Sequence, residues 1–277
     1  MAATTSITCD KLIRLIGTAS CPAILDVRAD EDFADFPALI PGSMRRKFEF
    51  VEGWAAEFKG QPAIAVCRHG GGVSAGVAAW LRAAGVEAET LDGGIHAWAQ
   101  AGHPAVPESS LPPRNALGHT LWVTRSRPKV DRIACPWLIR RFVDRGATFL
   151  FVPPAEVAAV AERFGATPFD VDGVHWSHRG DLCTFDVMVE LFGLTGLPAL
   201  DRLALIVRGA DTARPELAPQ SAGLLAVSLG LSRIHADDLE QLEAGMPLYD
   251  AFYRWCRDAV EETHDWVSHQ PRPRVKA

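Results

Sequence analysis

Hydrophobic and polar positions follow two different patterns along the chain. In the N-terminal part, short apolar runs at Pro22–Arg28 and Ala63–Cys67 predict buried strands, and the alanine-rich stretch Ser74–Gly85 predicts a helix that ends at a glycine. Strands that alternate with helices are typical of a parallel sheet covered by helices. We therefore expect an α/β domain with a parallel sheet and flanking helices here.

The C-terminal part is dominated by helical periodicity. One strand is predicted at His119–Arg125, and segments with the spacing of a helix follow it. These segments are residues 131–146, 154–165, 183–193, 198–211, 219–230 and 237–267. The second domain is therefore predicted to be mainly α-helical.

The stretch His103–Arg114 is rich in proline and serine, which is typical of a linker. We place the first domain at residues 1–105, the linker at 106–117 and the second domain at 118–268. The polar, proline-containing tail at 269–277 is predicted to be disordered.

Composition and charge restrict the partners that we expect. With 277 residues, of which 48% are hydrophobic, the chain can fill two cores. Its formal net charge of −6 argues against a general nucleic-acid binder, because such proteins neutralise phosphates with an excess of lysine and arginine. DNA binding is therefore disfavoured, small molecules are the expected partners, and a homo-oligomer is compatible with the sequence.

The cysteines and the apolar runs indicate the cellular compartment in which we expect the protein. Six cysteines lie far apart without a CxxC pair, which predicts free thiols in a reducing compartment. No apolar run approaches the roughly 18 residues that a membrane-spanning helix needs, and the N-terminus lacks the basic and apolar order of a secretion signal. We expect a cytoplasmic protein that does not bind membranes.

One cysteine opens a loop that is rich in glycine. In VCRHGGGVSAG (Val66–Gly76), Cys67 ends a predicted strand and is followed by three glycines and the start of a helix. Backbone N–H groups in such a loop, with the positive end of the helix dipole, stabilise a thiolate or an oxyanion. Arg68 and His69 add donors beside the thiol. The residues alone are equally compatible with a small buried hydrophobic side chain at a strand end.

Residues 7–105 resemble the rhodanese (sulfurtransferase) family. The resemblance is carried by ILDVRADEDF (Ile24–Phe33), IPGS (Ile40–Ser43), the VCRHG loop entry, the helix SAGVAAWLRAAG and LDGGIHAW (Leu91–Trp98). It implies that Cys67 is a nucleophile that accepts a sulfane sulfur, becomes a persulfide and passes the sulfur to a thiophilic acceptor. Sulfur transfer of this kind requires no cofactor.

The resemblance also implies supporting roles. Asp26 and Arg28 are expected to be structural, holding the cysteine loop by charge-assisted hydrogen bonds, and Trp98 is expected in the core. The residues of the loop that are expected to bind an anion are Arg68, His69, Gly70, Gly71, Gly72, Val73 and Ser74.

The loop departs from the commonest rhodanese pattern. The stretch Cys67–Val73 has seven residues, whereas that pattern has six. The related Cdc25-type phosphatases and arsenate reductases have a longer loop, but Val73 stands where their phosphate-binding arginine would be. Without that charge we expect neither strong dianion binding nor phosphatase turnover, and Arg68 is only a partial substitute.

The second domain opens with a basic segment. A helix that begins near Asp131 places Asp131 and Cys135 on one face. Arg132 and Arg140 are candidates for binding an oxyanion. The basic residues that are expected to be only solvated are Lys129, Arg141 and Arg145.

A second polar segment has a high density of possible metal ligands. They are His175, His178, Asp181, Cys183, Asp186 and Glu190. We expect His178, Cys183 and Asp186 to hold a divalent metal, because Cys183 and Asp186 share a helical face and His178 approaches from the preceding loop. The alternative is that there is no metal and Asp181 caps the helix.

Residues 119–268 resemble the C-terminal domain of the chromate-resistance (ChrB) family. The shared motifs are SRPKVDRIACPWLIRRF, PFDVDGVHWSHRGDLCTFD, IVRGADT, APQSAGLLAVSLGLS and YDAFYRWC. The resemblance implies a role in chromate resistance, but not repression of transcription, because the family's regulators carry a different N-terminal domain. Within the motifs, the candidate site residues are Asp131, Arg132, Cys135, His178, Cys183, Asp186 and Asp211.

These observations leave two functions open, of which an enzyme is favoured. The first is a sulfurtransferase-like protein of chromate or oxyanion resistance, with a persulfide on Cys67 and an oxyanion or metal bound by the second domain. The second is a non-catalytic chromate or metal sensor with a degenerate rhodanese domain, which Val73 favours. If the second domain is only an interaction module, Pro247–Val260 forms core or dimer surface, of which core is favoured.

Overall fold

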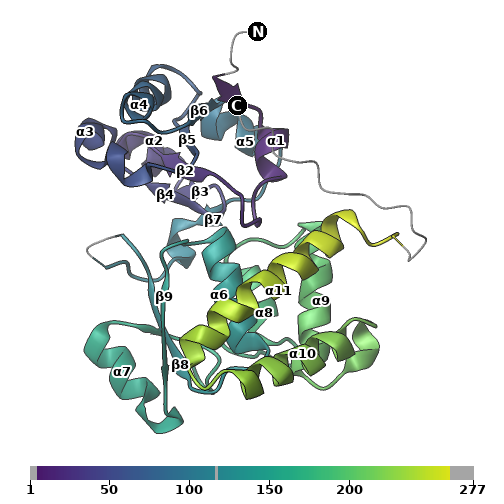
Figure 1. Cartoon of the computed structure of the whole chain (residues 1–277). Helices are drawn as coiled ribbons and strands as arrows, with labels where there is room; N and C mark the ends of the chain where they lie inside the picture. Colours follow the sequence, from purple (N-terminus) through teal and green to yellow (C-terminus); the bar gives the residue numbers. More distant parts are fainter. Residues whose placement is uncertain (1–4, 116–117, 263–277) are drawn as a thin grey trace.

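The computed structural model describes residues 5–115 and 118–262 of the chain. An N-terminal part that contains a sheet packs against a mainly helical C-terminal part (Figure 1). Within these ranges, no helix is long and apolar enough to cross a membrane.

The N-terminal part is a parallel sheet with flanking helices, as predicted. The strand order is β1-β6-β5-β2-β4, and every paired strand runs parallel to its neighbour. The strands are β1 (Ser6–Ile7), β2 (Ala23–Asp26), β4 (Ser43–Arg45), β5 (Ala63–Val66) and β6 (Ala88–Leu91). The helices are α1 (Cys9–Ile13), α2 (Asp30–Asp35), α3 (Val51–Trp54), α4 (Gly72–Ala83) and α5 (Gly94–Gln100).

The local sequence explains the central elements of this sheet. Every residue of β2 and β5 is buried, as expected for strands of a parallel sheet that is covered on both faces. Both strands lie within the predicted apolar runs. The predicted helix is α4, and the chain leaves it at Gly85, whose φ of +83° favours glycine.

A short antiparallel pair ties the start of the predicted linker to the N-terminal part. β3 (Ala38–Leu39) pairs with β7 (Val106–Pro107), and a 3₁₀ turn at Glu108–Ser110 follows. The first linker residues therefore pack on the N-terminal sheet region. The domain boundaries stay a prediction, and the tail at 269–277 lies outside the described residues.

The C-terminal part is mainly helical, as predicted. The described helices are α6 (Asp131–Phe142), α7 (Val157–Phe164), α8 (Thr184–Leu191), α9 (Pro198–Asp211), α10 (Ser221–Ile234) and α11 (Asp238–Asp258). Each overlaps one predicted helical segment, and α10 extends past the end of its segment at residue 230.

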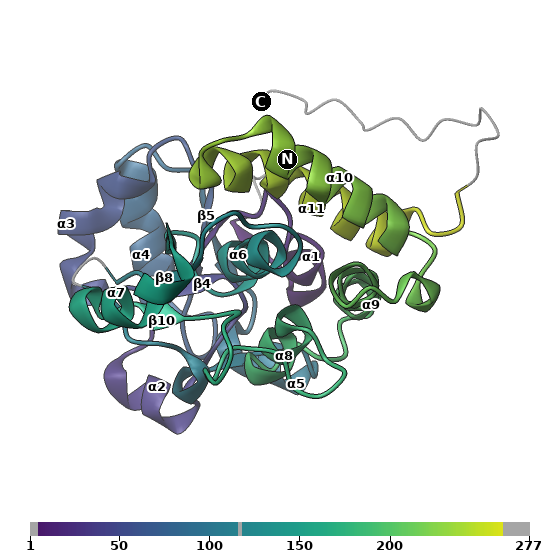
Figure 2. The same ribbon diagram turned by 90° about the horizontal axis from the view of Figure 1, so that it is seen from below.

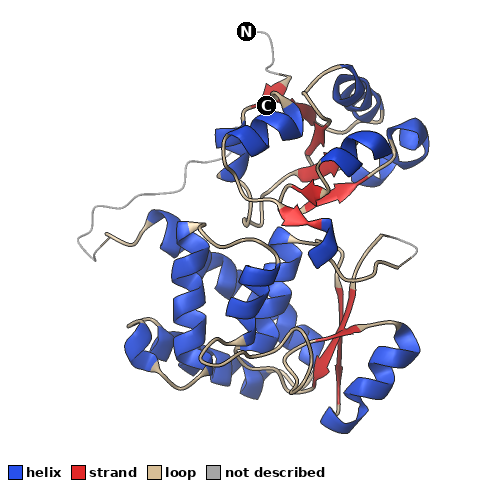
Figure 3. Ribbon diagram, turned by 180° about the vertical axis from the view of Figure 1, so that it is seen from behind, coloured by secondary structure: helices blue, strands red, loops and turns tan. Residues whose placement is uncertain are grey.

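A small parallel sheet accompanies these helices (Figure 3). Its order is β10-β8-β9, with β8 (Leu121–Arg125), β9 (Thr148–Val152) and β10 (Thr167–Pro168). β8 lies in the predicted strand, whereas β9 and β10 were not predicted. Because β8 and β9 are parallel, α6 is the crossover helix between them.

α6 is buried along most of its length. Arg132, Arg140 and Arg141 are its partly exposed residues, and the others are buried. Figure 2 shows this helix end-on, surrounded by strands and helices of both parts. The helix therefore belongs to the centre of the molecule.

The two parts share one hydrophobic cluster. It includes Leu12, Ile16 and Trp98 from the N-terminal part, together with Trp137 and Phe142 from α6. The side chain of Trp98 is fully buried, as expected. The cores of the two parts are therefore continuous.

The contact between the parts is close at two glycines. Gly17 has a φ of +79°, and a Cβ there would lie 2.4 Å from the Cζ atom of Phe142. The N–H of Gly42 donates a hydrogen bond to the carbonyl of Phe142 (2.5 Å). At Gly17 the backbone conformation and the ring of Phe142 together require glycine.

Two arginines that were expected to be solvated instead connect distant segments. Arg141 forms two hydrogen bonds with Asp250 of α11, both 2.8 Å long. Arg145 donates to the carbonyl of Cys21 in the N-terminal part (2.8 Å). The expectation was wrong for these residues because their partners are far away in sequence.

Replacing Phe142 by alanine is expected to lower the free energy of unfolding by about 3 to 5 kcal/mol, because the surrounding core fills such a cavity only in part. The matched control is Phe164→Ala, at a phenylalanine that is 60% exposed. The control should change the free energy of unfolding by about 0.5 kcal/mol or less. Urea unfolding followed by circular dichroism measures both, and equal losses would contradict the shared core.

Candidate functional site

The cysteine loop lies between β5 and α4. Cys67 directly follows β5, and only 6% of the residue is exposed. Its Sγ accepts a hydrogen bond from the N–H of Gly71 (3.2 Å) and lies 3.1 Å from the Oγ of Ser74. Ser74 lies in the first turn of α4 and is itself buried. The loop and the helix therefore enclose the sulfur together.

These donors change the acidity of the thiol. Burial raises the pKa of Cys67, because a thiolate loses hydration there. The hydroxyl of Ser74 and the backbone N–H groups of Ser74, Gly71 and His69 lower this pKa and outweigh the burial. The pKa of Cys67 is therefore below its ordinary value, and the thiolate fraction at neutral pH is higher than for an unperturbed cysteine.

The first turn of α5 holds the back of the loop. The N–H groups of Ile95 and His96 donate to the carbonyls of Cys67 and Arg68, both at 3.0 Å. A Cβ at Gly94 would lie 2.2 Å from the carbonyl oxygen of Cys67. Glycine is therefore required at residue 94, where α5 touches the cysteine loop, and this explains the second glycine of LDGGIHAW.

Arg68 was expected to bind an anion in the cysteine loop, but its side chain is engaged elsewhere. Its guanidinium pairs with Asp32 and Asp35 of α2, both at 2.8 Å. These hydrogen bonds raise the pKa of Arg68, so the side chain stays charged but engaged. The loop therefore gains no free guanidinium from Arg68.

The remaining loop residues shape its backbone and surface. Gly70 has a φ of +70°, and a Cβ there would lie 2.7 Å from backbone atoms just before α5. The ring of His69 lies edge-to-face against that of His96, with 5.1 Å between the ring centroids. Val73, at the position of an arginine in the related phosphatases, is 38% exposed. Val73 is uncharged, so it does not replace the positive charge that the arginine of the related phosphatases supplies.

Asp26 and Arg28 form a buried ion pair that supports a different segment from the one expected. The Asp26 carboxylate lies 2.9 Å from Nε and 2.5 Å from Nη2 of Arg28. The same guanidinium donates to the carbonyls of Phe36 and Ala38, both at 2.8 Å. The pair therefore holds the connection between α2 and β3, because the guanidinium points toward that connection.

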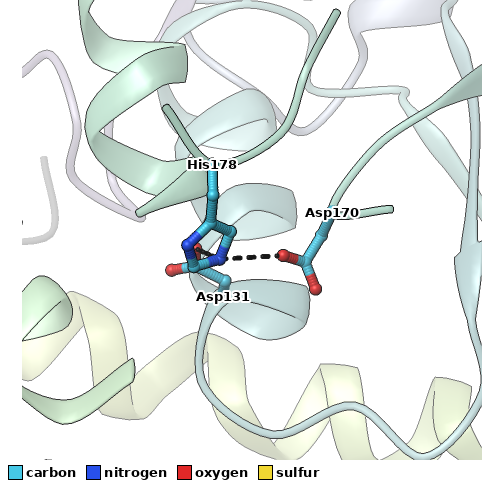
Figure 4. Close-up of side chains that lie close together, drawn as sticks. All are labelled: Asp131, Asp170 and His178. Atoms are coloured by element: carbon cyan, nitrogen blue, oxygen red, sulfur yellow. Dashed lines mark ion pairs between the residues drawn. The ribbon is translucent and has the colours of Figure 1, made fainter. Parts of the chain in front are cut away.

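A second polar cluster lies in the C-terminal part, where four segments converge. His178 Nε2 lies 3.3 Å from Asp170 Oδ1, 3.3 Å from Asp211 Oδ2 and 3.6 Å from Asp131 Oδ2. Asp131 begins α6, Asp170 follows β10, His178 precedes α8 and Asp211 ends α9. Figure 4 shows three of these side chains pointing toward one another. We refer to the four residues as the Asp–His cluster.

Asp131 is the most deeply buried member of the cluster, with 1% of the residue exposed. Its Oδ2 accepts hydrogen bonds from the N–H groups of Thr184 (2.6 Å) and Phe185 (3.3 Å) at the start of α8. Its Oδ1 is buried and has no hydrogen-bond partner within the described ranges of the chain. One carboxylate oxygen in the cluster therefore remains available.

Both carboxylate oxygens of Asp170 have partners that fix the orientation of the side chain. Its Oδ2 lies 3.2 Å from Nε of Arg132 and 3.3 Å from Nη2 of Arg125. Its Oδ1 accepts a hydrogen bond from the hydroxyl of Thr184 (2.8 Å) and faces His178. The arginines therefore hold one oxygen and leave the other toward the cluster.

The charges of the cluster shift one another's pKa values. Burial, reinforced by the negative charges of Asp211 and Asp170, raises the pKa of Asp131 well above its ordinary value. Hydrogen bonds to Asp170 and Asp211 raise the pKa of His178 to about 10. The imidazole is therefore a cation at neutral pH and partly neutralises the carboxylates around it.

Of the three residues that were expected to bind a metal, Cys183 and Asp186 stay together at the start of α8, whereas His178 faces other side chains. Cys183 is the N-cap of α8, and its N–H donates to Oδ2 of Asp186 (3.1 Å). The same Asp186 oxygen lies 3.3 Å from Nε of Arg208. His178 is instead surrounded by aspartates, so the structure does not group it with Cys183 and Asp186 as expected. Asp181 pairs with Arg214 (3.7 Å) and does not cap the helix.

The other candidates in this domain differ in what they contribute. Asp131 and Asp211 belong to the cluster, and Arg132 contacts it through Asp170. Cys135 is fully buried, and burial raises the pKa of its thiol well above the ordinary value, as it does for Cys183. Sequence reasoning missed Asp170, although its place after an apolar run in PFDVDG was a usable signal.

Both parts of the chain match known protein families. Residues 8–101 match the family described as a rhodanese-like domain, and residues 122–256 match the family described as ChrB, C-terminal domain. The chain therefore contains a rhodanese-like domain followed by a ChrB C-terminal domain, which confirms both predicted resemblances. The cysteine loop lies in the first match and the Asp–His cluster in the second.

Individual relatives match one part of the chain each. Protein ChrB of Cupriavidus metallidurans is 38% identical over 133 residues, which are 48% of this chain and 39% of that protein. A rhodanese-like domain protein from Staphylococcus aureus is 31% identical over 34% of this chain and 91% of its own, with a TM-score of 0.31. A rhodanese-related protein from Thermoplasma volcanium is 24% identical over 36% of this chain and 96% of its own, with a TM-score of 0.32.

The lowered pKa of Cys67 predicts how the thiol reacts with iodoacetamide. Because the thiolate is the nucleophile, the alkylation rate should reach half of its maximum below the ordinary cysteine pKa of about 8.5. Ser74→Ala removes one donor to the thiolate and should raise this midpoint by about one pH unit. Mass spectrometry of the peptide that contains Cys67 separates it from the other cysteines.

The control for this measurement is Ser109→Ala, at an exposed serine outside the loop. It should leave the midpoint unchanged. A midpoint at the ordinary cysteine pKa in the native protein, or one that Ser74→Ala does not move, would show that these donors do not stabilise the thiolate.

Proposed function

We propose that this protein acts in chromate resistance and that its rhodanese-like domain is a sulfurtransferase in which Cys67 carries a persulfide. One observation carries the proposal. The buried thiol of Cys67 is hydrogen-bonded with Gly71 and Ser74, and its pKa is below the ordinary value. The two family matches support the combination of sulfur transfer with chromate resistance.

In the proposed first step, the thiolate of Cys67 attacks the outer sulfur of a donor such as thiosulfate. A sulfur–sulfur bond forms at Cys67, the sulfur–sulfur bond of thiosulfate breaks, and sulfite leaves with its electron pair. In the second step, a nucleophilic acceptor such as cyanide takes the outer sulfur as thiocyanate and restores the thiolate. No proton, metal or external oxidant is needed for either step.

The hydrogen-bond donors around the sulfur suit both steps. A persulfide is an anion, as the thiolate is, so donors that lower the pKa of Cys67 also stabilise the intermediate. The oxyanion of a phosphate ester carries more charge and is usually held by an arginine in such loops. With Val73 at that position and Arg68 held by Asp32 and Asp35, sulfur transfer is favoured over phosphate hydrolysis.

For the ChrB C-terminal domain we propose a role in handling chromate that does not place the dianion in the Asp–His cluster. Three aspartates converge there, and they repel a dianion. The two arginines that were suggested for oxyanion binding are engaged, Arg132 with Asp170 (3.2 Å) and Arg140 with Glu243 (2.6 Å). The charge of this site therefore favours a cation.

The alternative function is a non-catalytic sensor with a degenerate rhodanese domain. The position of Val73 favours it, because an active loop of this length ordinarily uses an arginine there. The two functions differ in what they require of Cys67. A sensor does not need the thiol, whereas the sulfurtransferase loses its nucleophile with it.

Thiocyanate formation from thiosulfate and cyanide tests the proposal. Cys67→Ser should reduce the rate to that of the reaction without protein, because a hydroxyl at this position does not accept sulfane sulfur. Ser74→Ala should reduce the rate by about 10-fold, since a hydrogen bond to a charged group contributes about 1.5 kcal/mol. The rate is measured colorimetrically at fixed pH.

The matched control is Cys9→Ser, at a partly exposed cysteine outside the loop. It should retain the activity of the unmodified protein. Equal rates for the unmodified protein and Cys67→Ser would remove the catalytic role of Cys67 and favour the sensor.

A further inference from the structure

We propose that the Asp–His cluster binds one first-row divalent metal ion, with Asp131, Asp170, Asp211 and His178 as protein ligands. The proposal concerns the ChrB C-terminal domain and does not depend on sulfur transfer at Cys67. It rests on the distances between the ligand atoms, on a buried carboxylate oxygen without a partner, and on the way neighbouring residues orient the ligands.

The spacing of the ligand atoms fits a single ion. A first-row metal about 2.1 Å from each ligand atom holds neighbouring ligand atoms about 3 to 3.5 Å apart. His178 Nε2 lies 3.3 Å from an oxygen of Asp170, 3.3 Å from an oxygen of Asp211 and 3.6 Å from an oxygen of Asp131. Ligand atoms of Asp131, Asp170 and His178 all lie within 4.8 Å of one another. Asp211 faces His178 from outside this group of three, so ion binding requires its carboxylate to move inward and the imidazolium to release its Nε2 proton to solvent.

An independent observation comes from Asp131 Oδ1. This oxygen is buried and has no hydrogen-bond partner among residues 5–115 and 118–262, while Oδ2 already accepts from the N–H groups of Thr184 and Phe185. Buried carboxylate oxygens are normally paired, because leaving one without a partner is unfavourable. A cation beside this carboxylate adds positive charge where Oδ1 has no partner, while Oδ2 is the oxygen that faces His178.

The neighbours of the ligands behave as supports of a metal site. Arg125 and Arg132 hold Oδ2 of Asp170 and leave Oδ1 facing His178. The hydroxyl of Thr184 fixes that Oδ1 with a 2.8 Å hydrogen bond. Residues that orient metal ligands in this way are typical of metal sites, because they reduce the movement that is needed on binding.

The chemistry of the ligands selects the kind of ion. Three carboxylates and one imidazole suit a hard to borderline cation such as Mn²⁺, whereas soft ions favour thiolates. Cys183 caps α8 and is not among the residues whose ligand atoms gather around His178. The side chain of His178 is 42% exposed, which leaves a path for the ion and room for water as a further ligand.

Direct titration with Mn²⁺ tests the proposal on the full-length chain, freed of any affinity tag and of metal by chelation and dialysis. Calorimetry should give one Mn²⁺ per chain, and electron paramagnetic resonance should show the loss of the free-ion signal. Asp211→Asn keeps the shape of the side chain and should weaken binding at least about 10-fold, because it removes a ligand charge. Saturating Mn²⁺ should also raise the melting temperature of the native protein.

The matched control is Asp172→Asn, at an exposed aspartate in the loop that contains His178. It should bind Mn²⁺ as the native protein does. Circular dichroism without metal establishes that each variant is folded, and if Asp211→Asn fails this check, His178→Gln at the exposed edge of the cluster provides the same readout. No binding by the native protein at millimolar Mn²⁺, or equal binding by the folded ligand variant, would make the cluster an ion-paired structural element and overturn the proposal.

Discussion

The burial of α6 is the constraint on which both parts of the structure depend. Its side chains join one hydrophobic cluster with residues of the N-terminal sheet and its helices, and Phe142 at its end packs against Gly17. The first residue of the same helix is Asp131, whose carboxylate enters the Asp–His cluster. One helix therefore fixes both the contact between the domains and one side of the Asp–His cluster. Its stability comes mainly from this packing and less from its own helix propensity.

The two candidate sites accommodate negative charge in different ways. At Cys67, backbone N–H groups and one hydroxyl stabilise a single anion, so the thiol becomes more acidic although it is buried. In the Asp–His cluster, several carboxylates lie together, so their mutual repulsion adds to the effect of burial and the pKa of Asp131 rises well above its ordinary value. The first arrangement favours nucleophilic chemistry at sulfur, and the second favours a bound cation.

Much of the fold could be predicted because the relevant signals are local. The apolar run at β5, the glycines of the loop and the helix α4 follow one another in the sequence, so the environment of Cys67 was foreseeable. The partners of Arg68 and Arg28 could not be predicted, since they depend on where α2 and β3 lie in the fold. The neighbours of His178 were not foreseen for the same reason. Helical spacing placed Cys183 beside Asp186, but it carries no information about Asp170, which arrives from the end of the unpredicted strand β10.

Mass spectrometry of the native protein after incubation with thiosulfate tests the central claim most directly, because it detects the proposed intermediate itself. The account predicts that the peptide with Cys67 gains the mass of one sulfur atom, that sulfite is released in equal amount, and that cyanide removes the added sulfur. An unmodified Cys67 peptide after prolonged incubation, with no release of sulfite, would contradict the account.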